Sequence, residues 1–220
     1  VRPQVAVVSG VRRGSSYAYR GTVGWGPALC ESADAVVIEV DETAPDLGGP
    51  LIEGTVKAIV PSNVGLVGAP RDVSERELII GRHVGSLIPP EATIQVGPGG
   101  VTTAIIDALE HPVAVQSGLV TDAVASLHER GGLIGNVMAG YVWGGEPVAA
   151  LADAGRLELH RAEVTHDVGR IGATPRMVAC NAALQVGLDG SVNVEQVGGR
   201  VVAGIGGHSD FCAGAAQSLG

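Results

Sequence analysis

The chain has 220 residues, 45% of them hydrophobic and 17% charged, and its formal net charge is −9. A chain of this length and apolar content can bury a core that offsets the entropy of ordering, which excludes a disordered protein. The acidic balance argues against a binder of nucleic-acid phosphates, and no run of about 18 apolar residues predicts a membrane span. The first residues show no secretion signal. We therefore expect a cytoplasmic globular protein with neither a nucleic-acid nor a membrane partner.

The N-terminal part contains two short runs rich in valine and isoleucine, residues 5–8 and 35–40. Such runs, bounded by glycine and polar residues, are typical of buried strands. Residues 14–27 have no periodicity and are expected to be irregular, either a binding loop or a small packing cluster. Proline, glycine, serine and asparagine without a period in residues 61–72 predict a domain boundary near residue 70. The two expected units are residues 1–70 and 71–220.

The second expected unit alternates strand and helix patterns. Ser74 and Glu77 have the spacing of a capping box, which predicts a helix that ends near Leu87. Alternation of strands and helices implies right-handed crossovers and a mostly parallel sheet. We therefore expect an α/β fold, an open and mostly parallel sheet with helices on both faces, preceded by a partial α/β domain at the N-terminus. Strands are expected at residues 93–96, 113–116, 136–142 and 157–164, and helices at residues 101–110, 119–130 and 147–154.

The alternation stops after Arg170. Residues 177–188 form an apolar run, and Asp189 and Gly190 follow it. The Asp-Gly pair is a strong turn signal between strands. It predicts a β-hairpin that leads into the last glycine-rich motif.

Two glycine-rich turns each lead into a predicted helix, the first with Gly97 and Gly99 and the second with Gly206 and Gly207. Bare backbone at a helix N-terminus favours a phosphate or a developing oxyanion. The alternative is that these glycines only form tight turns. A dinucleotide fingerprint needs glycine at position 102, where the chain has threonine, so NAD binding is disfavoured.

Histidine, acidic and cysteine residues suggest further sites. His208 and Asp210 have the chemistry of an acid and a base, but Ser209 and Asp210 are equally typical of helix caps. One group resembles a set of metal ligands, but positions 160 and 163 would point to opposite faces of a strand, so we expect no metal site. That group contains His160, Glu163, His166 and Asp167. Buried thiols in a reducing compartment, rather than disulfides or a zinc site, are expected at Cys30, Cys180 and Cys212.

Several ordered blocks of the chain carry a specific resemblance. They are Gln-Val-Gly-Pro-Gly at 95–99, Ala-Val-Gln-Ser-Gly-Leu-Val-Thr-Asp at 114–122, Met-Val-Ala-Cys-Asn-Ala-Ala-Leu-Gln-Val at 177–186 and Gly-Gly-His-Ser-Asp-Phe at 206–211. In order and spacing the chain resembles the acetyl-CoA hydrolase/transferase family, class I CoA-transferases related to 4-hydroxybutyrate and acetate CoA-transferases. The resemblance extends from about residue 36 to residue 218. Members of the family are longer at both ends, so it implies the end of one α/β domain and most of a second, truncated one.

The resemblance implies a nucleophile that this chain lacks. In the family, a glutamate attacks the acyl-CoA carbonyl and becomes a glutamyl-CoA thioester, which divides one difficult exchange into two acyl transfers. The matching position here is Gly118, which cannot form a thioester; Gln116 and Ser117 replace the family's histidine and threonine, and Asp122 matches. The helpers that remain are Asp122 and His208. The resemblance implies that coenzyme A, as substrate or ligand and with no other cofactor, contacts Gln95, Gly97, Pro98, Gly99, Gly206 and Gly207.

Three functions remain open. The first is an acyl-CoA hydrolase or related CoA-dependent enzyme in which water replaces the glutamate. The second is a catalytically inactive protein that binds CoA or forms a subunit interface, and the third is a Rossmann-like nucleotide binder. The expected partners are a CoA thioester, a small carboxylate, and a second copy of the chain or a partner subunit. We also expect an open crevice around Gly118 that would accept a glutamate side chain.

Overall fold

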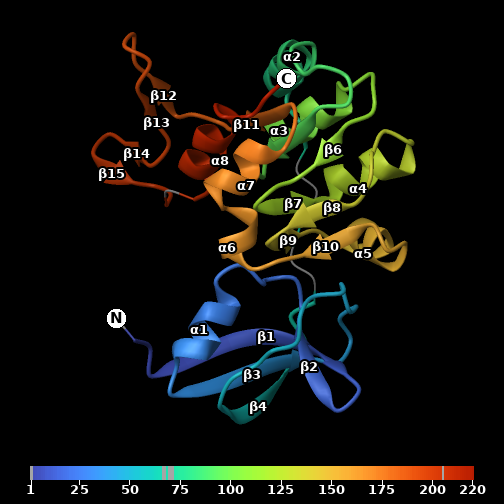
Figure 1. Cartoon of the computed structure of the whole chain (residues 1–220), viewed down its shortest axis with the longest axis vertical. Helices are drawn as coiled ribbons and strands as arrows, with labels where there is room; N and C mark the ends of the chain where they lie inside the picture. The colour runs from blue at the N-terminus through green and yellow to red at the C-terminus, as the bar shows by residue number, and fades with distance from the viewer. Residues whose placement is uncertain (1, 66–67, 69–71, 205) are drawn as a thin grey trace.

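The structure is a computed structural model, which describes residues 2–65, 68, 72–204 and 206–220. The N-terminal part is a four-stranded sheet with the order β2-β1-β3-β4 (Figure 1). β1 and β3 are parallel, as are β3 and β4, whereas β2 forms an antiparallel hairpin with β1. The bounds are Val5–Arg13 for β1, Ser16–Tyr19 for β2, Ala35–Asp41 for β3 and Val56–Ser62 for β4.

The strands expected at residues 5–8 and 35–40 are confirmed, but the irregular segment is not. Residues 14–27 contain β2 and the start of helix α1, Gly26–Ser32. Pro27 lies in the first turn of α1, where a proline is well tolerated because its missing N–H group has no partner there. The boundary expected near residue 70 lies outside the described residues.

The larger part contains parallel strands whose neighbours are distant in sequence. β5 pairs in parallel with both β11 and β6, and β8 pairs in parallel with β10. A parallel bridge between Gln116 and Met138 places the end of β6 beside β8. The expected α/β fold with mostly parallel strands is therefore confirmed. The bounds are Thr93–Val96 for β5, Ala114–Val115 for β6, Val137–Ala139 for β8, Leu157–Leu159 for β10 and Met177–Cys180 for β11.

Helices lie on both sides of these strands. In Figure 1, α6, α7 and α8 lie to the left of the strands, and α4 and α5 lie to the right. Helices α2, α3, α4 and α5 form a row in which each helix contacts the next. The bounds are Glu75–Gly85 for α2, Gly100–Asp107 for α3, Asp122–Glu129 for α4, Glu146–Asp153 for α5, Ala162–Thr165 for α6, Val168–Ala173 for α7 and His208–Ala215 for α8.

Three predicted elements are wrong in part. The helix expected from residue 119 begins at Asp122, because Leu119–Thr121 is strand β7, parallel to β9, Tyr141–Trp143. The strand expected over residues 136–142 is two strands of different sheets, β8 and β9. The strand expected over residues 157–164 ends at Leu159, and α6 follows it. The errors at residues 119–121 and 160–164 come from apolar runs, which suit a strand or a buried helix equally well.

The predicted hairpin is confirmed and forms part of a projecting arm (Figure 1). β12, Gln185–Val186, pairs antiparallel with β13, Val192–Asn193. In the turn, the Asp189 carboxylate accepts a hydrogen bond from the Ser191 N–H group, and Gly190 has a φ of +86°, a left-handed conformation that favours glycine. A second short hairpin follows, between β14, Gln196–Val197, and β15, Arg200–Val201.

One hydrophobic cluster joins the two expected units. It contains Val36 and Ile38 of the N-terminal sheet together with Ile94 and Ile106 of the larger part. A second, small cluster consists of Ile171, Met177 and Phe211. In the described part of the chain, no helix is long and apolar enough to cross a membrane.

The capping box that begins α2 is confirmed, and α2 then packs closely on α3. The Ser74 hydroxyl accepts from the Glu77 N–H group, and the Glu77 carboxylate accepts from Ser74. Gly81 and Gly85 are buried against α3. A Cβ at Gly81 would lie 2.6 Å from the Cβ of Ala104 and would overlap its backbone carbonyl, whereas a Cβ at Gly85 would lie 3.2 Å from the Cβ of Ala108.

These two glycines give a matched test of the helix packing. Gly81→Ala is expected to lower the free energy of unfolding by about 1–3 kcal/mol, because backbone atoms of α3 would have to move. Both substitutions gain about 1 kcal/mol of helix propensity. In Gly85→Ala the new contact with Ala108 is tolerable, so the free energy of unfolding is expected to stay within about 1 kcal/mol of wild type. Urea unfolding measures both values. Equal stabilities for the two variants would contradict the close approach at Gly81.

Candidate functional site

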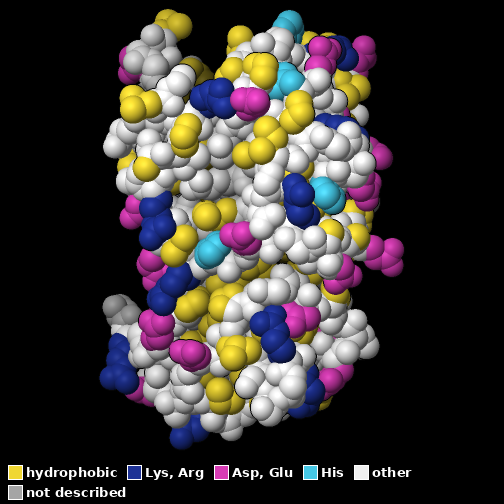
Figure 2. Space-filling view, turned by 45° about the vertical axis from the view of Figure 1, so that its right-hand side comes forward, with side chains coloured by type: hydrophobic (Ala, Val, Ile, Leu, Met, Phe, Trp, Pro, Cys, Tyr) yellow, Lys and Arg dark blue, Asp and Glu magenta, His cyan; other side chains and the backbone are white. Residues whose placement is uncertain are grey.

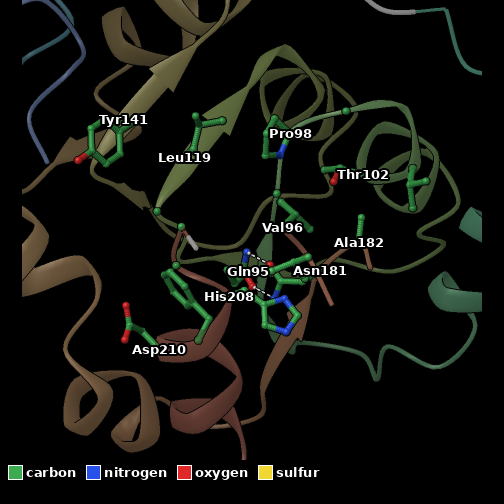
Figure 3. A pocket seen from close by; sticks show the side chains of 18 of the residues that line it. Gln95, Val96, Pro98, Thr102, Leu119, Tyr141, Asn181, Ala182, His208 and Asp210 are labelled. Carbon is green, nitrogen blue, oxygen red and sulfur yellow. Dashed lines mark hydrogen bonds between the residues drawn. The ribbon is translucent and has the colours of Figure 1, made fainter. Parts of the chain in front are cut away.

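A cavity of about 670 Å³ lies at the carboxyl ends of β5 and β11, beside the segment that follows β6. Both glycine-rich turns line it, as do Gly118 and His166. Figure 3 shows the labelled side chains around this space, with Gln95 and Asn181 joined by hydrogen bonds. The structure therefore brings together two turns that lie about a hundred residues apart in sequence, as expected for strand ends in an α/β fold.

A pair of side-chain amides lies on the cavity wall. Gln95 donates to the Asn181 Oδ1 at 3.1 Å, and Asn181 donates to the Gln95 Oε1 at 2.8 Å (Figure 3). Gln95 is 4% exposed, and its strand pairs with the strand that precedes Asn181. Gln95 was expected at the site. Asn181 was not, although it falls in one of the blocks that carry the resemblance.

The first glycine turn already has an anionic neighbour. Gly99 has a φ of +118°, a conformation that L-side chains rarely adopt, and α3 begins at Gly100. A Cβ at Gly100 would overlap the carboxylate of Glu77, which also belongs to the capping box of α2. Negative charge is favourable at a helix N-terminus. The carboxylate of Glu77 therefore lies beside the start of α3, and its charge would repel an anion bound there.

The second glycine turn leads directly into α8. Gly206 has a φ of +58°, and Gly207 is the N-cap residue of α8 with no side-chain cap. The capping roles expected for Ser209 and Asp210 are therefore wrong. His208 and Asp210 lie in the first turn of α8 and line the cavity. The Nδ1 of His208 is buried and has no hydrogen-bond partner among the described residues.

Asp122 has a structural role outside the cavity. Its two carboxylate oxygens accept from the Gly145 N–H group at 3.0 and 3.1 Å, and it begins α4. Asp122 is not among the residues that line the cavity. The structure thus separates the two expected helpers, and only His208 borders the space where a substrate would lie.

The space beside Gly118 is filled, which corrects the expected open crevice. A Cβ at Gly118 would lie 2.8 Å from the Nε2 of His166 and 3.5 Å from the ring of Phe211. A Cβ at Gly207 would lie 2.7 Å from the same Nε2. The imidazole of His166 is therefore enclosed by two glycines, and it takes the volume that a side chain at position 118 would need.

His166 is held on both sides of its ring. Its Nδ1 lies 2.8 Å from the Oγ1 of Thr165, which is completely buried. Its ring meets the ring of Phe211 edge to face, with centroids 5.2 Å apart. Burial lowers the pKa of His166, and the negative charge of Asp210 opposes this shift. Sequence reasoning placed His166 only in a rejected metal site, because nothing local indicates that it reaches Gly118.

The cysteines and the rejected metal ligands give no metal centre in the part of the chain that the structure describes. There, no three histidine, cysteine or acidic side chains lie close enough to hold an ion. The thiols of Cys30, Cys180 and Cys212 are free; the first two are buried, as expected, but Cys212 is exposed, which corrects that expectation. Burial raises the pKa of Cys180 to about 11, so this thiol is protonated at neutral pH and is a weak nucleophile.

In sequence the chain is similar to CoA-transferases. Residues 148–220 match the family model of the acetyl-CoA hydrolase/transferase C-terminal domain. The chain is 27% identical over 204 residues to 4-hydroxybutyrate coenzyme A transferase of Clostridium kluyveri, covering 86% of this chain and 48% of that protein. It is 26% identical over 218 residues to butyryl-CoA:acetate CoA-transferase of Anaerostipes caccae, covering 88% and 48%. The chain thus spans about half the length of these relatives.

Solved structures share the fold. The 4-hydroxybutyrate CoA-transferase from Porphyromonas gingivalis has a TM-score of 0.84 at 24% identity, over 98% of this chain and 56% of that one. RipA from Yersinia pestis has a TM-score of 0.85 at 20% identity, over 98% and 53%. These structures show the fold, and the sequence matches confirm the resemblance: residues 148–220 match the acetyl-CoA hydrolase/transferase C-terminal domain, and most of the chain is similar to CoA-transferases.

Proposed function

We propose that the cavity binds a CoA thioester and that the protein hydrolyses it, with water in place of a glutamate nucleophile. One observation carries this proposal: position 118 is a glycine, and the ring of His166 fills its side-chain volume. A carboxylate therefore cannot attack from that position. The relatives named above act on CoA thioesters, which supports the substrate class.

The shape and lining of the cavity support a bound thioester. Its volume of about 670 Å³ lies within the range of about 300–1,000 Å³ that is usual for small-molecule sites. The bare backbone of Gly206 and Gly207 allows a ligand to approach closely, and the first N–H groups of α8 would stabilise the oxyanion. The proposed CoA contacts are Gln95, Gly97, Pro98, Gly99, Gly206 and Gly207, all of which line the cavity.

The setting and the products follow from the same chemistry. Hydrolysis would release CoA thiol and a small carboxylate. Free cysteines in the structure support a reducing compartment such as the cytoplasm. On the face seen in Figure 2, arginines alternate with acidic side chains without a basic patch, which supports a partner other than nucleic acid. The oligomeric partner that we expect is a second copy or another subunit.

Calorimetry with CoA tests the binding part of this proposal. The wild-type protein is expected to bind CoA, and Gly207→Val is expected to weaken binding about tenfold or more, which corresponds to about 1.4 kcal/mol. The reason is that the new Cβ would lie 2.7 Å from His166 and would enter the cavity. Ala213→Val, on the exposed side of the same helix, is the control. Equal affinities for wild type and Gly207→Val would remove this turn from the CoA site.

Release of thiol from acetyl-CoA tests the chemical part. Turnover by the wild-type protein supports hydrolysis. CoA binding without thiol release would instead favour the alternative function, a CoA-binding protein without activity, which the loss of a carboxylate at Gly118 also suits. Retention of NAD in preference to CoA would favour a nucleotide binder and contradict both.

A further inference from the structure

The Nε2 of His166 lies at the meeting point of the two segments that the proposed reaction needs. On one side is Gly118, at the position of the family nucleophile, and on the other is Gly207, at the start of α8. Cβ atoms at these two glycines would lie 2.8 and 2.7 Å from this nitrogen. The nitrogen therefore stands beside the helix start that would stabilise the oxyanion, next to the point from which the family's glutamate side chain would extend.

The backbone around His166 fixes the direction of the ring. The His166 N–H group donates to the Ala162 carbonyl at 2.8 Å, which closes α6. The next residue, Asp167, caps α7 by accepting from the Arg170 N–H group at 2.7 Å. The residue is thus held between two helix ends, and its side chain does not need to reorganise to reach the cavity.

The second ring nitrogen has a partner that can set the tautomer. Nδ1 lies 2.8 Å from the Oγ1 of the fully buried Thr165. When Nδ1–H donates to this hydroxyl oxygen, Nε2 has a free lone pair directed away from Thr165. A general base in catalysis is commonly oriented in this way by a hydrogen bond to its other nitrogen.

We propose that His166 is the general base that activates water for thioester hydrolysis, an inference that rests on the proposed function. Nε2 takes a proton from water while the water oxygen forms a bond to the carbonyl carbon and the carbonyl π electrons move to its oxygen. The tetrahedral intermediate then collapses, the C–S bond breaks, and the imidazolium returns its proton to the sulfur. The products are a carboxylic acid and CoA thiol, so that atoms and charge balance.

His208 is the competing base in the same cavity. Its Nδ1 is buried and has no hydrogen-bond partner among the described residues, so no such bond orients its ring. His166, in contrast, has Thr165 on Nδ1 and the ring of Phe211 beside it. The charge of Asp210 also favours the imidazolium that forms when His166 accepts a proton. These contacts favour His166.

The pH dependence follows from the surroundings of the ring. Burial lowers the pKa of His166 and Asp210 acts against it, with a net decrease. A base must be deprotonated, so kcat is expected to rise with pH and to reach half its maximum below about 6.5, the ordinary value for histidine. Other titratable or charged groups on the neighbouring elements are His208 on α8, Tyr141 on β9, Glu163 on α6, paired with Arg161, and Asp167 and Arg170 at the start of α7.

The test compares histidine variants of the full-length protein with acetyl-CoA as substrate. His166→Gln keeps a polar side chain of similar length but cannot take up a proton. It is expected to lower kcat about 100-fold or more, since a general base contributes about 10²–10⁴. The dissociation constant for CoA is expected to stay within about threefold. His160→Gln is the control, because His160 pairs with Glu158 away from the cavity and its loss is expected to leave kcat unchanged.

Several outcomes would contradict the role of His166 as the base without contradicting the proposed function. One is a His166→Gln variant with kcat within about threefold of wild type. Another is a kcat that no longer falls at low pH in His208→Gln but still falls at low pH in His166→Gln. If His166→Gln does not fold, the wild-type profile decides, because a flat kcat between about pH 5 and 8 is incompatible with a histidine base. A wild-type protein that does not bind CoA, or binds it without turnover, would instead overturn the proposed function.

Discussion

Gly118→Glu is expected to destabilise the protein by about 1–3 kcal/mol and to form no CoA thioester on incubation with acetyl-CoA. The new side chain would begin 2.8 Å from the Nε2 of His166 and 3.5 Å from the ring of Phe211. One of these rings would have to move, or the glutamate would have to turn away from the cavity. Urea unfolding measures the loss of stability, and intact mass measures the adduct.

A paired substitution separates lack of space from lack of chemistry. Gly118→Glu with His166→Gly removes the ring that occupies the space, and it is expected to be more stable than the sum of the two single changes predicts. Residues in contact couple by about 0.5–3 kcal/mol, which sets the size of this effect. With its carboxylate in the cavity, the double variant is expected to gain mass by a bound CoA.

The matched control for added charge and length is Gly97→Glu. Gly97 lines the same cavity, but a Cβ there would have no neighbour within 4 Å. The Gly97→Glu variant is expected to unfold at nearly the same urea concentration as the wild-type protein. A CoA adduct on the wild-type protein would mean that another carboxylate is the nucleophile. Additive stabilities in the double variant would mean that His166 does not fill the space beside Gly118.

The fold could be predicted where its signals are local. The capping box at Ser74 and Glu77 marks the start of α2, because both partners lie within one helical turn. The Asp189-Gly190 pair marks the hairpin turn in the same way. By contrast, Leu119–Thr121 is a strand only because β9 lies beside it, and no local pattern in the sequence contains that partner.

The site could be predicted only in part, for the same reason. Its glycine turns are sequence motifs, and the cavity brings them together. What fills the cavity wall depends on distant residues: the carboxylate of Glu77 reaches Gly100, and the ring of His166 reaches Gly118. The sequence shows that position 118 has no side chain, but it does not show which other side chain fills that volume.

Phe211→Ala is expected to lower the free energy of unfolding by about 3–5 kcal/mol, the usual cost of removing a buried phenylalanine side chain. Phe211 is 1% exposed and forms the small cluster with Ile171 and Met177. Its loss would leave a cavity between α7 and α8, which are in direct contact. Urea unfolding of Phe211→Ala and of the milder Ile171→Val, expected to cost about 0.5–1.5 kcal/mol, measures the effect. A loss below about 1 kcal/mol for Phe211→Ala would contradict this packing.

The location of this cluster determines which parts of the protein lose stability in Phe211→Ala. Phe211 also supports the ring of His166 edge to face, so the same change is expected to lower kcat by freeing that ring. The cluster is separate from the main core, which contains Ile94 of β5. Local stability varies across a protein, so amides of α8 are expected to exchange with deuterium faster in Phe211→Ala while amides of β5 change much less. Equal acceleration in both elements would mean that the small cluster and the main core unfold as one unit, and that the position of His166 depends on the stability of the whole chain.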